Sequence, residues 1–197
     1  SSSNSLSLTI TGTSVVSSSG SKPAFTNTDG SITSLVRANP TYGQSIVSWS
    51  GTGSGSSPTI GHGLNSAPDC IIVKRRSSAN GAWPFLHEFD TTKYLQFQDV
   101  DAASTGATVF DNTAPTSSVF TVNATNAVVN ASGHTYIAYC WHSVTGYSKF
   151  GSYSGTGSNV SVTTGFAPAF TIIKRTDTTE NWFIFDNTRE PDGVVDL

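Results

Sequence analysis

Charged side chains are scarce in this sequence. Of its 197 residues only 12% are Asp, Glu, Lys or Arg, whereas about 25% is usual for a soluble globular domain. The formal net charge is -3, and no basic cluster exceeds the triplet Lys74, Arg75 and Arg76. The sequence therefore lacks the basic surface that binds a nucleic-acid backbone, and we expect no nucleic acid among its partners.

Long apolar runs and methionine are also missing. No apolar stretch approaches the roughly 20 residues that a membrane-spanning helix needs. The Ser-rich N-terminal segment has neither the basic region nor the apolar core of a signal peptide. We expect a soluble chain with no membrane insertion. Because Met is absent throughout, position 1 included, we also expect a processed product or a fragment of a longer chain.

Short β-type runs fill the sequence between turn residues. They are rich in Val, Ile, Thr and aromatic residues and are bounded by Gly, Ser, Asn and Pro, as strands are. Their spacing predicts an all-β fold, an antiparallel β-sandwich or jelly-roll-like arrangement. The predicted strands are 5–10, 31–37, 45–50, 70–75, 83–89, 93–98, 119–122, 135–142, 149–153, 170–174 and 182–186.

An internal repeat is the most informative feature. The pentapeptide Ser-Gly-Thr-Gly-Ser occurs at 50–54 and again at 154–158. Flanking residues match in the same order, with a shorter loop in the second copy. The matched pairs are Leu35 and Tyr139, Val36 and Cys140, Trp49 and Tyr153, Pro68 and Pro168, Cys70 and Phe170, Lys74 and Lys174, Arg75 and Arg175, and Trp83 and Trp182.

The repeat predicts three segments. Residues 1–44 form the closing part of a preceding β unit or a linker, 45–148 a complete β-sandwich repeat unit, and 149–197 the opening half of a second unit. An opening half leaves strand edges and an apolar face without partners. We expect it to find its missing strands in residues 1–44, in a neighbouring subunit or in chain beyond Leu197, and we favour the last two.

Matching apolar positions also predict matching strand pairing, because a slip of one residue would turn every core side chain outward. We expect 45–89 and 149–186 to follow the same backbone path, with one hairpin in each and with Trp83 and Trp182 in equivalent environments. Alternation places Cys70 and Ile72 on the buried face. Since Phe170 and Val36 replace the two cysteines, Cys70 and Cys140, in the other copies, we predict buried free thiols.

Several motifs stand out along the chain. They are Ser-Gly-Thr-Gly-Ser at 50–54, Gly-His-Gly-Leu at 61–64, Ala67-Pro68, Ile-Ile-Val-Lys-Arg at 71–75, Tyr-Ile-Ala-Tyr-Cys at 136–140 and Gly-Tyr-Ser-Lys-Phe-Gly-Ser-Tyr at 146–153. Together they resemble an uncharacterised repeat family of virion structural and tail-fibre-like proteins from marine bacteriophages, including those that infect cyanobacteria and pelagic bacteria. The resemblance covers about residues 20–190. It implies a virion setting and offers no catalytic residues to carry over.

Residues that suggest site chemistry have simpler interpretations. His62, in Gly-His-Gly, would suit a metal ligand or a general base, but the second copy has Thr there, which favours a turn residue. The other histidines lack zinc-ligand spacing. Acidic residues near position 100 would suit calcium or acid-base chemistry, but their turn positions favour solvated carboxylates. These other candidates are His87, His134, His142, Glu88, Asp90, Asp99 and Asp101. Sequons at Asn123, Asn130 and Asn159 are expected by chance in so Asn- and Ser-rich a chain.

Aromatic residues give the alternative to a purely structural role. A hairpin would bring Arg75 to Trp83 and Arg175 to Trp182 for cation-π stacking. Trp83, Trp182 and Tyr147 would instead suit a glycan-stacking platform, although recurrence in the repeat favours core packing.

We therefore expect a non-enzymatic virion structural module, in a tail fibre, capsid fibre or decoration protein, that acts by assembly and host attachment. Its expected partners are other virion proteins or copies of itself in a homo-oligomer, and a host surface glycan. No cofactor or metal is expected. The alternative is a carbohydrate-binding adhesin domain.

Overall fold

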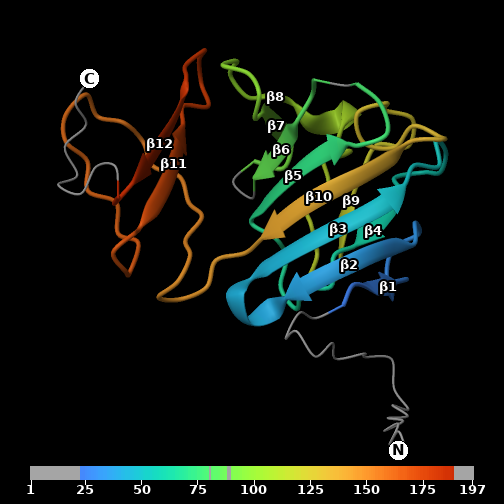
Figure 1. The fold of residues 1–197 in the computed structure, drawn as a ribbon. Helices are drawn as coiled ribbons and strands as arrows, with labels where there is room; N and C mark the ends of the chain where they lie inside the picture. The colour runs from blue at the N-terminus through green and yellow to red at the C-terminus, as the bar shows by residue number, and fades with distance from the viewer. Residues whose placement is uncertain (1–22, 80, 88–89, 189–197) are drawn as a thin grey trace, which may run out of the picture.

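The computed structural model describes residues 23–79, 81–87 and 90–188, and it is nearly all β, with 36% of residues in strands and 3% in helices. The strands pair antiparallel, which confirms the predicted fold class (Figure 1). The elements in chain order are β1 (Phe25–Asn27), β2 (Ser34–Asn39), the 3-10 helix η1 (Pro40–Tyr42), β3 (Gln44–Ser50), β4 (Thr59–Gly61), β5 (Cys70–Arg75), β6 (Pro84–His87), β7 (Lys93–Gln96), β8 (Ser104–Thr105), the 3-10 helix η2 (Gly106–Thr108), β9 (Val119–Thr121), β10 (Thr135–Trp141), β11 (Phe170–Lys174) and β12 (Trp182–Asp186).

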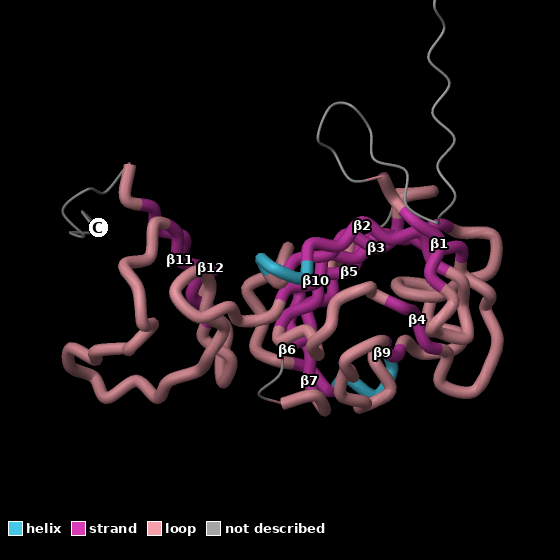
Figure 2. Tube along the Cα trace, turned by 90° about the horizontal axis from the view of Figure 1, so that it is seen from below, coloured by secondary structure: helices cyan, strands magenta, loops and turns pink. Residues whose placement is uncertain are grey.

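Eight strands form one sheet, in the order β1-β2-β3-β10-β5-β6-β7-β8. The late strand β10 lies between β3 and β5, so the chain crosses back to close the centre of the sheet. The pair β4-β9 covers one face of this sheet as a second, smaller layer, and β11-β12 form a separate hairpin beside it (Figure 2). Among the described residues, neither short helix has the length or apolar character to cross a bilayer.

The core lies between the large sheet and the β4-β9 layer. Alternate residues of β10 face it, beginning with Tyr136, and all are fully buried. Burial of this apolar surface is the main stabilising contribution. The core comprises Ile32, Val36, Val47, Trp49, Ile60, Leu64, Ile71, Val73, Leu86, Val109, Phe110, Phe120, Val122, Val129, Tyr136, Ala138 and Cys140.

The prediction that Cys70 and Ile72 mark the core-facing side of β5 is wrong. Ile71 and Val73 are fully buried in the core, whereas Ile72 lies on the opposite face and is only half-buried. The strand is apolar on both faces, so alternation alone did not identify the core side. Cys70 is buried on the outer face and Cys140 on the core face, because Cys140 lies opposite Ile71 in the register. Both thiols are free, as predicted.

Most predicted strands are present, and β5, β11 and β12 coincide with the predicted ranges. The predicted strand 149–153 is wrong, since these residues are coil. Its counterpart β3 is held between β2 and β10, and no described strand pairs with 149–153. The short strands β1, β4 and β8 were not predicted. The predicted strand 5–10 lies outside the described residues.

The two repeat hairpins share one register. Cys70 lies opposite His87 and Ile72 opposite Phe85, while Phe170 lies opposite Asp186 and Ile172 opposite Ile184. These pairs are equivalent once the loop of the second copy is shortened by one residue, which confirms the predicted hairpins. The division into units at residues 44 and 148 stays a prediction. In the structure, strands from both sides of residue 44 share the large sheet.

Candidate functional site

The repeated Ser-Gly-Thr-Gly-Ser loop at 50–54 packs against the segment 124–134 that leads into β10. The Gly51 N–H donates to the His134 carbonyl at 2.8 Å, and the Gly53 N–H donates to the Asn130 carbonyl at 2.8 Å. The Thr52 N–H donates to Asn130 Oδ1 at 3.0 Å. Asn130 is fully buried, and its Nδ2 donates to the Ala124 carbonyl at 2.9 Å. This motif therefore closes the module.

Glycine is required in this loop by close packing. A Cβ on Gly51 would lie 2.2 Å from the Ala131 carbonyl oxygen and 2.8 Å from the Tyr136 ring. Gly53 has φ +62°, a left-handed conformation that glycine adopts without strain. In the first copy, these glycines therefore permit a close approach between two backbone segments.

Two aromatic side chains fix the other side of this contact. The Trp49 ring stacks on the Tyr136 ring, with centroids 5.4 Å apart and planes at 18°. Trp49 Nε1 donates to the Val129 carbonyl at 3.2 Å. The Tyr136 hydroxyl accepts from the Ala131 N–H at 2.8 Å and donates to the Ala127 carbonyl at 2.9 Å. These bonds satisfy the polar groups of a buried loop.

The second copy of the motif keeps the local shape without this contact. Thr156 Oγ1 donates to the Ser158 carbonyl at 3.4 Å, as Thr52 Oγ1 does to Ser54 at 3.1 Å. Gly157 has φ +76°. A Cβ on Gly155, the counterpart of Gly51, would meet no atom within 4 Å.

His62 directly follows β4 and has a structural role. It is fully buried. Its Nδ1 accepts from the Leu64 N–H at 3.1 Å, and its Nε2 lies 3.1 Å from the Thr116 carbonyl. This arrangement requires a neutral ring with the proton on Nε2. Burial lowers the pKa of His62, against an opposing contribution from its bond to Thr116.

The lowered pKa of His62 predicts acid sensitivity. The unfolded chain binds the proton at a higher pH than the folded chain, so the free energy of unfolding should fall as the pH decreases below about 6.5. His87, whose pKa burial also lowers, contributes in the same direction. Urea unfolding between pH 7.5 and 5 measures the slope. His62→Gln should reduce stability at pH 7.5 and flatten the slope, whereas an unchanged slope would contradict this assignment.

The acidic residues lie in turns and at the hairpin contact. Asp90 accepts bonds from Thr92 and forms an exposed ion pair with Lys93 at 3.5 Å. Asp99 accepts from the Val100 N–H at 2.7 Å. Asp101 is exposed. Within the described part of the chain, no three His, Cys, Asp or Glu residues gather in a way that would hold a metal ion. Glu88 lies outside the described residues.

Trp83, Trp182 and Tyr147 each contact a different group. Lys74 Nζ lies 4.8 Å from the Trp83 ring centre, so the lysine of the Lys-Arg pair, and not Arg75, makes the cation-π contact. Tyr147 packs on Tyr42 with centroids 4.9 Å apart, and both rings are at least half-exposed.

Trp182 packs on Phe85 of β6 and on Phe97, at centroid distances of 5.4 and 4.9 Å. Its Nε1 donates to the Asp99 carbonyl at 2.9 Å. The predicted equivalence of Trp83 and Trp182 environments is therefore wrong, because only Trp182 bridges two parts of the chain.

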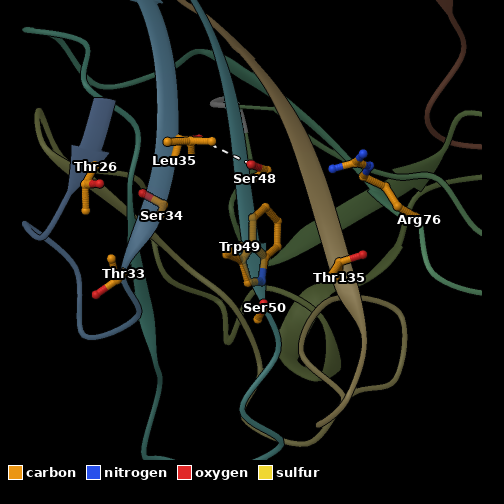
Figure 3. Close-up of a pocket in the computed structure, with 9 residues that line it drawn as sticks. All are labelled: Thr26, Thr33, Ser34, Leu35, Ser48, Trp49, Ser50, Arg76 and Thr135. Carbon is orange, nitrogen blue, oxygen red and sulfur yellow. Dashed lines mark hydrogen bonds between the residues drawn. The ribbon is translucent and has the colours of Figure 1, made fainter. Parts of the chain in front are cut away.

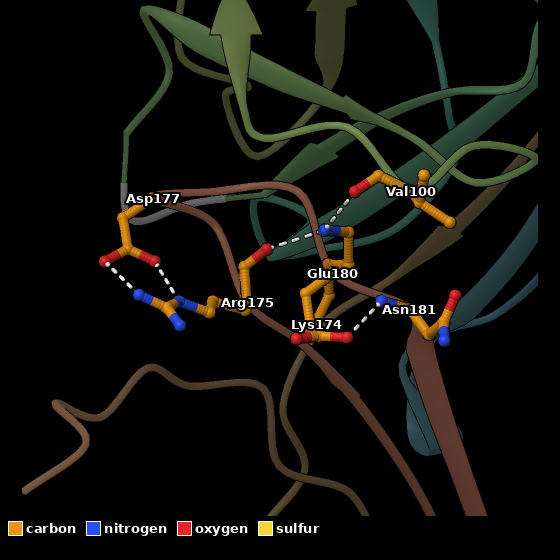
Figure 4. A network of polar contacts seen from close by, with 6 residues as sticks. All are labelled: Val100, Lys174, Arg175, Asp177, Glu180 and Asn181. Atoms are coloured by element: carbon orange, nitrogen blue, oxygen red, sulfur yellow. Dashed lines mark hydrogen bonds and ion pairs between the residues drawn. The ribbon is translucent and has the colours of Figure 1, made fainter. Parts of the chain in front are cut away.

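Backbone bonds extend this contact between the β11-β12 hairpin and residues 99–103. The Ala103 N–H donates to the Thr176 carbonyl at 2.9 Å, and the Glu180 N–H donates to the Val100 carbonyl at 2.8 Å. Lys174 Nζ also reaches the Val100 carbonyl, at 3.1 Å (Figure 4). The neighbouring pair of Arg175 and Asp177, at 2.6 Å, is exposed and contributes little to stability.

Trp182→Ala should loosen this hairpin without unfolding the sheet. Loss of the ring removes its two aromatic contacts and the bond to Asp99. We expect amide exchange of Ala103 and Glu180 to become about tenfold faster, with the melting temperature of the large sheet unchanged. Hydrogen exchange with mass spectrometry measures the first, and thermal unfolding followed by circular dichroism measures the second. Phe183→Ala, on the opposite and exposed face of β12, is the matched control and should leave exchange unaltered.

Two of the shallow grooves on the described surface lie near residues discussed above. One, of about 300 Å³, crosses β1, β2 and β3, where Ser48 Oγ donates to the Leu35 carbonyl at 3.5 Å (Figure 3). The other, of about 290 Å³, adjoins Tyr147. Its lining is mostly hydroxyl-bearing: Ser143, Thr145, Gly146, Ser148, Lys149, Thr163, Thr164 and Gly165.

The fold and the repeated loop define a class of all-β module whose sequence motifs serve packing between segments. The family described as "Domain of unknown function (DUF7483)" matches residues 7–197, so the chain belongs to that family. Searches of curated proteins and of solved structures found no match.

Proposed function

We propose that this chain is a non-enzymatic structural module of a bacteriophage particle, in a tail fibre, capsid fibre or decoration protein, and that it acts by assembly. The observation that carries the proposal is that the repeated motif packs segments of the chain against one another. Gly51 closes one unit through a close backbone approach, and the Asn130 and Tyr136 side chains do so by accepting backbone N–H bonds. The hairpin that opens the next unit docks through Trp182 on the first.

The proposed phage setting rests on the resemblance of the sequence motifs to those of virion structural and tail-fibre-like proteins of marine phages. Low charge and surfaces rich in Ser, Thr and Asn suit a particle exposed outside the cell. The partners are other virion proteins or further copies of the chain.

The location is tested by mass spectrometry of density-purified phage particles and of the particle-free lysate from the same infection. Peptides of this sequence should co-purify with particles in a constant ratio to the major capsid protein. Peptides confined to the particle-free fraction, or to the host periplasm, would remove the proposal.

A second candidate function, recognition of a host surface glycan, is favoured by one observation. The exposed Tyr42 and Tyr147 rings lie together beside a hydroxyl-lined groove, and sugar recognition combines aromatic surface with polar groups. A glycan array of host envelope polysaccharides tests it. Binding should be lost in Tyr147→Ala and retained in Tyr153→Ala, which removes another half-exposed ring. Equal binding by both variants would exclude this surface.

A further inference from the structure

The β11-β12 hairpin is the repeat counterpart of β5-β6, but within the described residues neither of its strands has a second neighbour. β5 lies between β10 and β6, whereas the described strand that pairs with β11 is β12 alone. The outer edge of β11 therefore has a row of backbone donors and acceptors without a strand beside it. Such an edge is a template for an added strand.

The side chains of this hairpin are also uncovered. Phe170 is 59% exposed, while its counterpart Cys70 is 3% exposed. Ile172 and Ile184 are each at least 40% exposed. Apolar surface of this kind usually marks an interaction site.

The loop at 154–158 provides an independent observation. It shares two features with the 50–54 loop, the threonine-to-serine bond and the left-handed glycine. The space before Gly155 is empty, whereas the space before Gly51 holds the Ala131 carbonyl. The second loop therefore has room for a partner segment like 124–134, which packs against the first loop.

We infer that the β11 edge and the 154–158 loop together bind the closing half of a further repeat unit of this family, supplied by polypeptide outside residues 1–197. The occupant is a segment equivalent to 124–142. Its strand would add to β11 in the β10-β5 register, with the residue equivalent to Tyr139 opposite Ile172 and that equivalent to Ile137 opposite Lys174. This inference rests on the proposed assembly function and specifies its interface.

Binding should also convert coil into strand. In the first copy, β10 pairs with β3 on one edge and with β5 on the other. Residues 149–153, the counterpart of β3, are coil. A docked strand would supply the partner that both 149–153 and β11 lack, so the two segments should become ordered together.

The test uses the full chain and a synthetic peptide of residues 124–142 carrying Cys140→Val, since Val36 stands at that repeat position. Hydrogen exchange is followed by mass spectrometry. At saturating peptide, exchange at 149–153 and at 170–174 should slow about tenfold or more, with 70–75 unchanged. Gly155→Ala, whose added Cβ is free of contacts in the chain alone but would strike the docked loop, should abolish the effect. Gly81→Ala, also in open space but in the β5-β6 loop outside the proposed interface, should retain it.

Three results would overturn the inference. One is slower hydrogen exchange at 70–75 alone, which would mean that the peptide replaces β10 beside β5. Another is protection that Gly155→Ala leaves intact. The third is a dimer of the chain alone, seen by sedimentation, in which 170–174 is already protected, because the occupant is then a second copy. Failure of peptide binding leaves the particle location standing, while absence from particles leaves the interface standing, so the two proposals fail separately.

Discussion

Gly51→Ala is expected to lower the free energy of unfolding of the large-sheet module by about 3 kcal/mol, the upper range for overpacking a well-filled site. The added Cβ would lie 2.2 Å from the Ala131 carbonyl oxygen. Neither side yields easily, because the loop is bonded to Asn130 and the Ala131 N–H is bonded to the Tyr136 hydroxyl. Urea unfolding followed by circular dichroism measures the change.

The repeat supplies the control for this prediction. Gly155→Ala makes the same substitution at the equivalent position, where a Cβ meets no atom within 4 Å. Its effect on unfolding should stay within about 0.5 kcal/mol, as for ordinary surface substitutions. Equal losses in the two variants would show that the cost arises from the glycine backbone itself, and would remove the packing argument.

Local patterns predicted those parts of the fold in which neighbours in sequence pair. The hairpins β5-β6 and β11-β12 followed from matched apolar positions, and their registers agree. Free thiols followed from Phe170 and Val36 at the repeat positions of the two cysteines. In each case the repeat supplied a second sequence for the same site.

Long-range closure could not be predicted in the same way. The insertion of β10 between β3 and β5 joins segments far apart in the chain, and no local pattern specifies which strands become neighbours. β5 is apolar on both faces, so alternation assigned the core side to the wrong face. Tertiary pairing also decides whether a strand forms. β3 lies between two strands, whereas its repeat counterpart at 149–153 pairs with no described strand and is coil.

The main residues of the candidate site were only partly visible in the sequence. Asn130 was noted as a sequon, but it is fully buried and bonds to Thr52 and Ala124, so a glycan could not reach it in the folded module. The available signal was the repeated Gly-Thr-Gly, because glycines retained in two copies indicate a close backbone approach. The sequence did not show which segment makes that approach.

Trp49→Ala is expected to have the largest effect, a loss of about 3–5 kcal/mol in the free energy of unfolding, as for other aromatic deletions in cores. Trp49 is 4% exposed. Its ring stacks on Tyr136 and meets Phe120 edge-on at 5.8 Å, and its indole N–H donates to the Val129 carbonyl. Truncation therefore leaves a cavity between the two layers and an unsatisfied buried carbonyl.

Trp49→Phe separates these contributions. It keeps most of the apolar area but removes the indole N–H, so the unfolding free energy should fall less, and exchange should accelerate first at 127–131, the segment that this bond and Tyr136 hold. Urea unfolding gives the global value and hydrogen exchange the local one. Trp182→Ala, which affects only the hairpin contact, provides the matched tryptophan control. A loss below about 1 kcal/mol in Trp49→Ala would mean that Trp49 does not join the sheet to the β4-β9 layer, and that Asn130 and Tyr136 hold the closing loop without it.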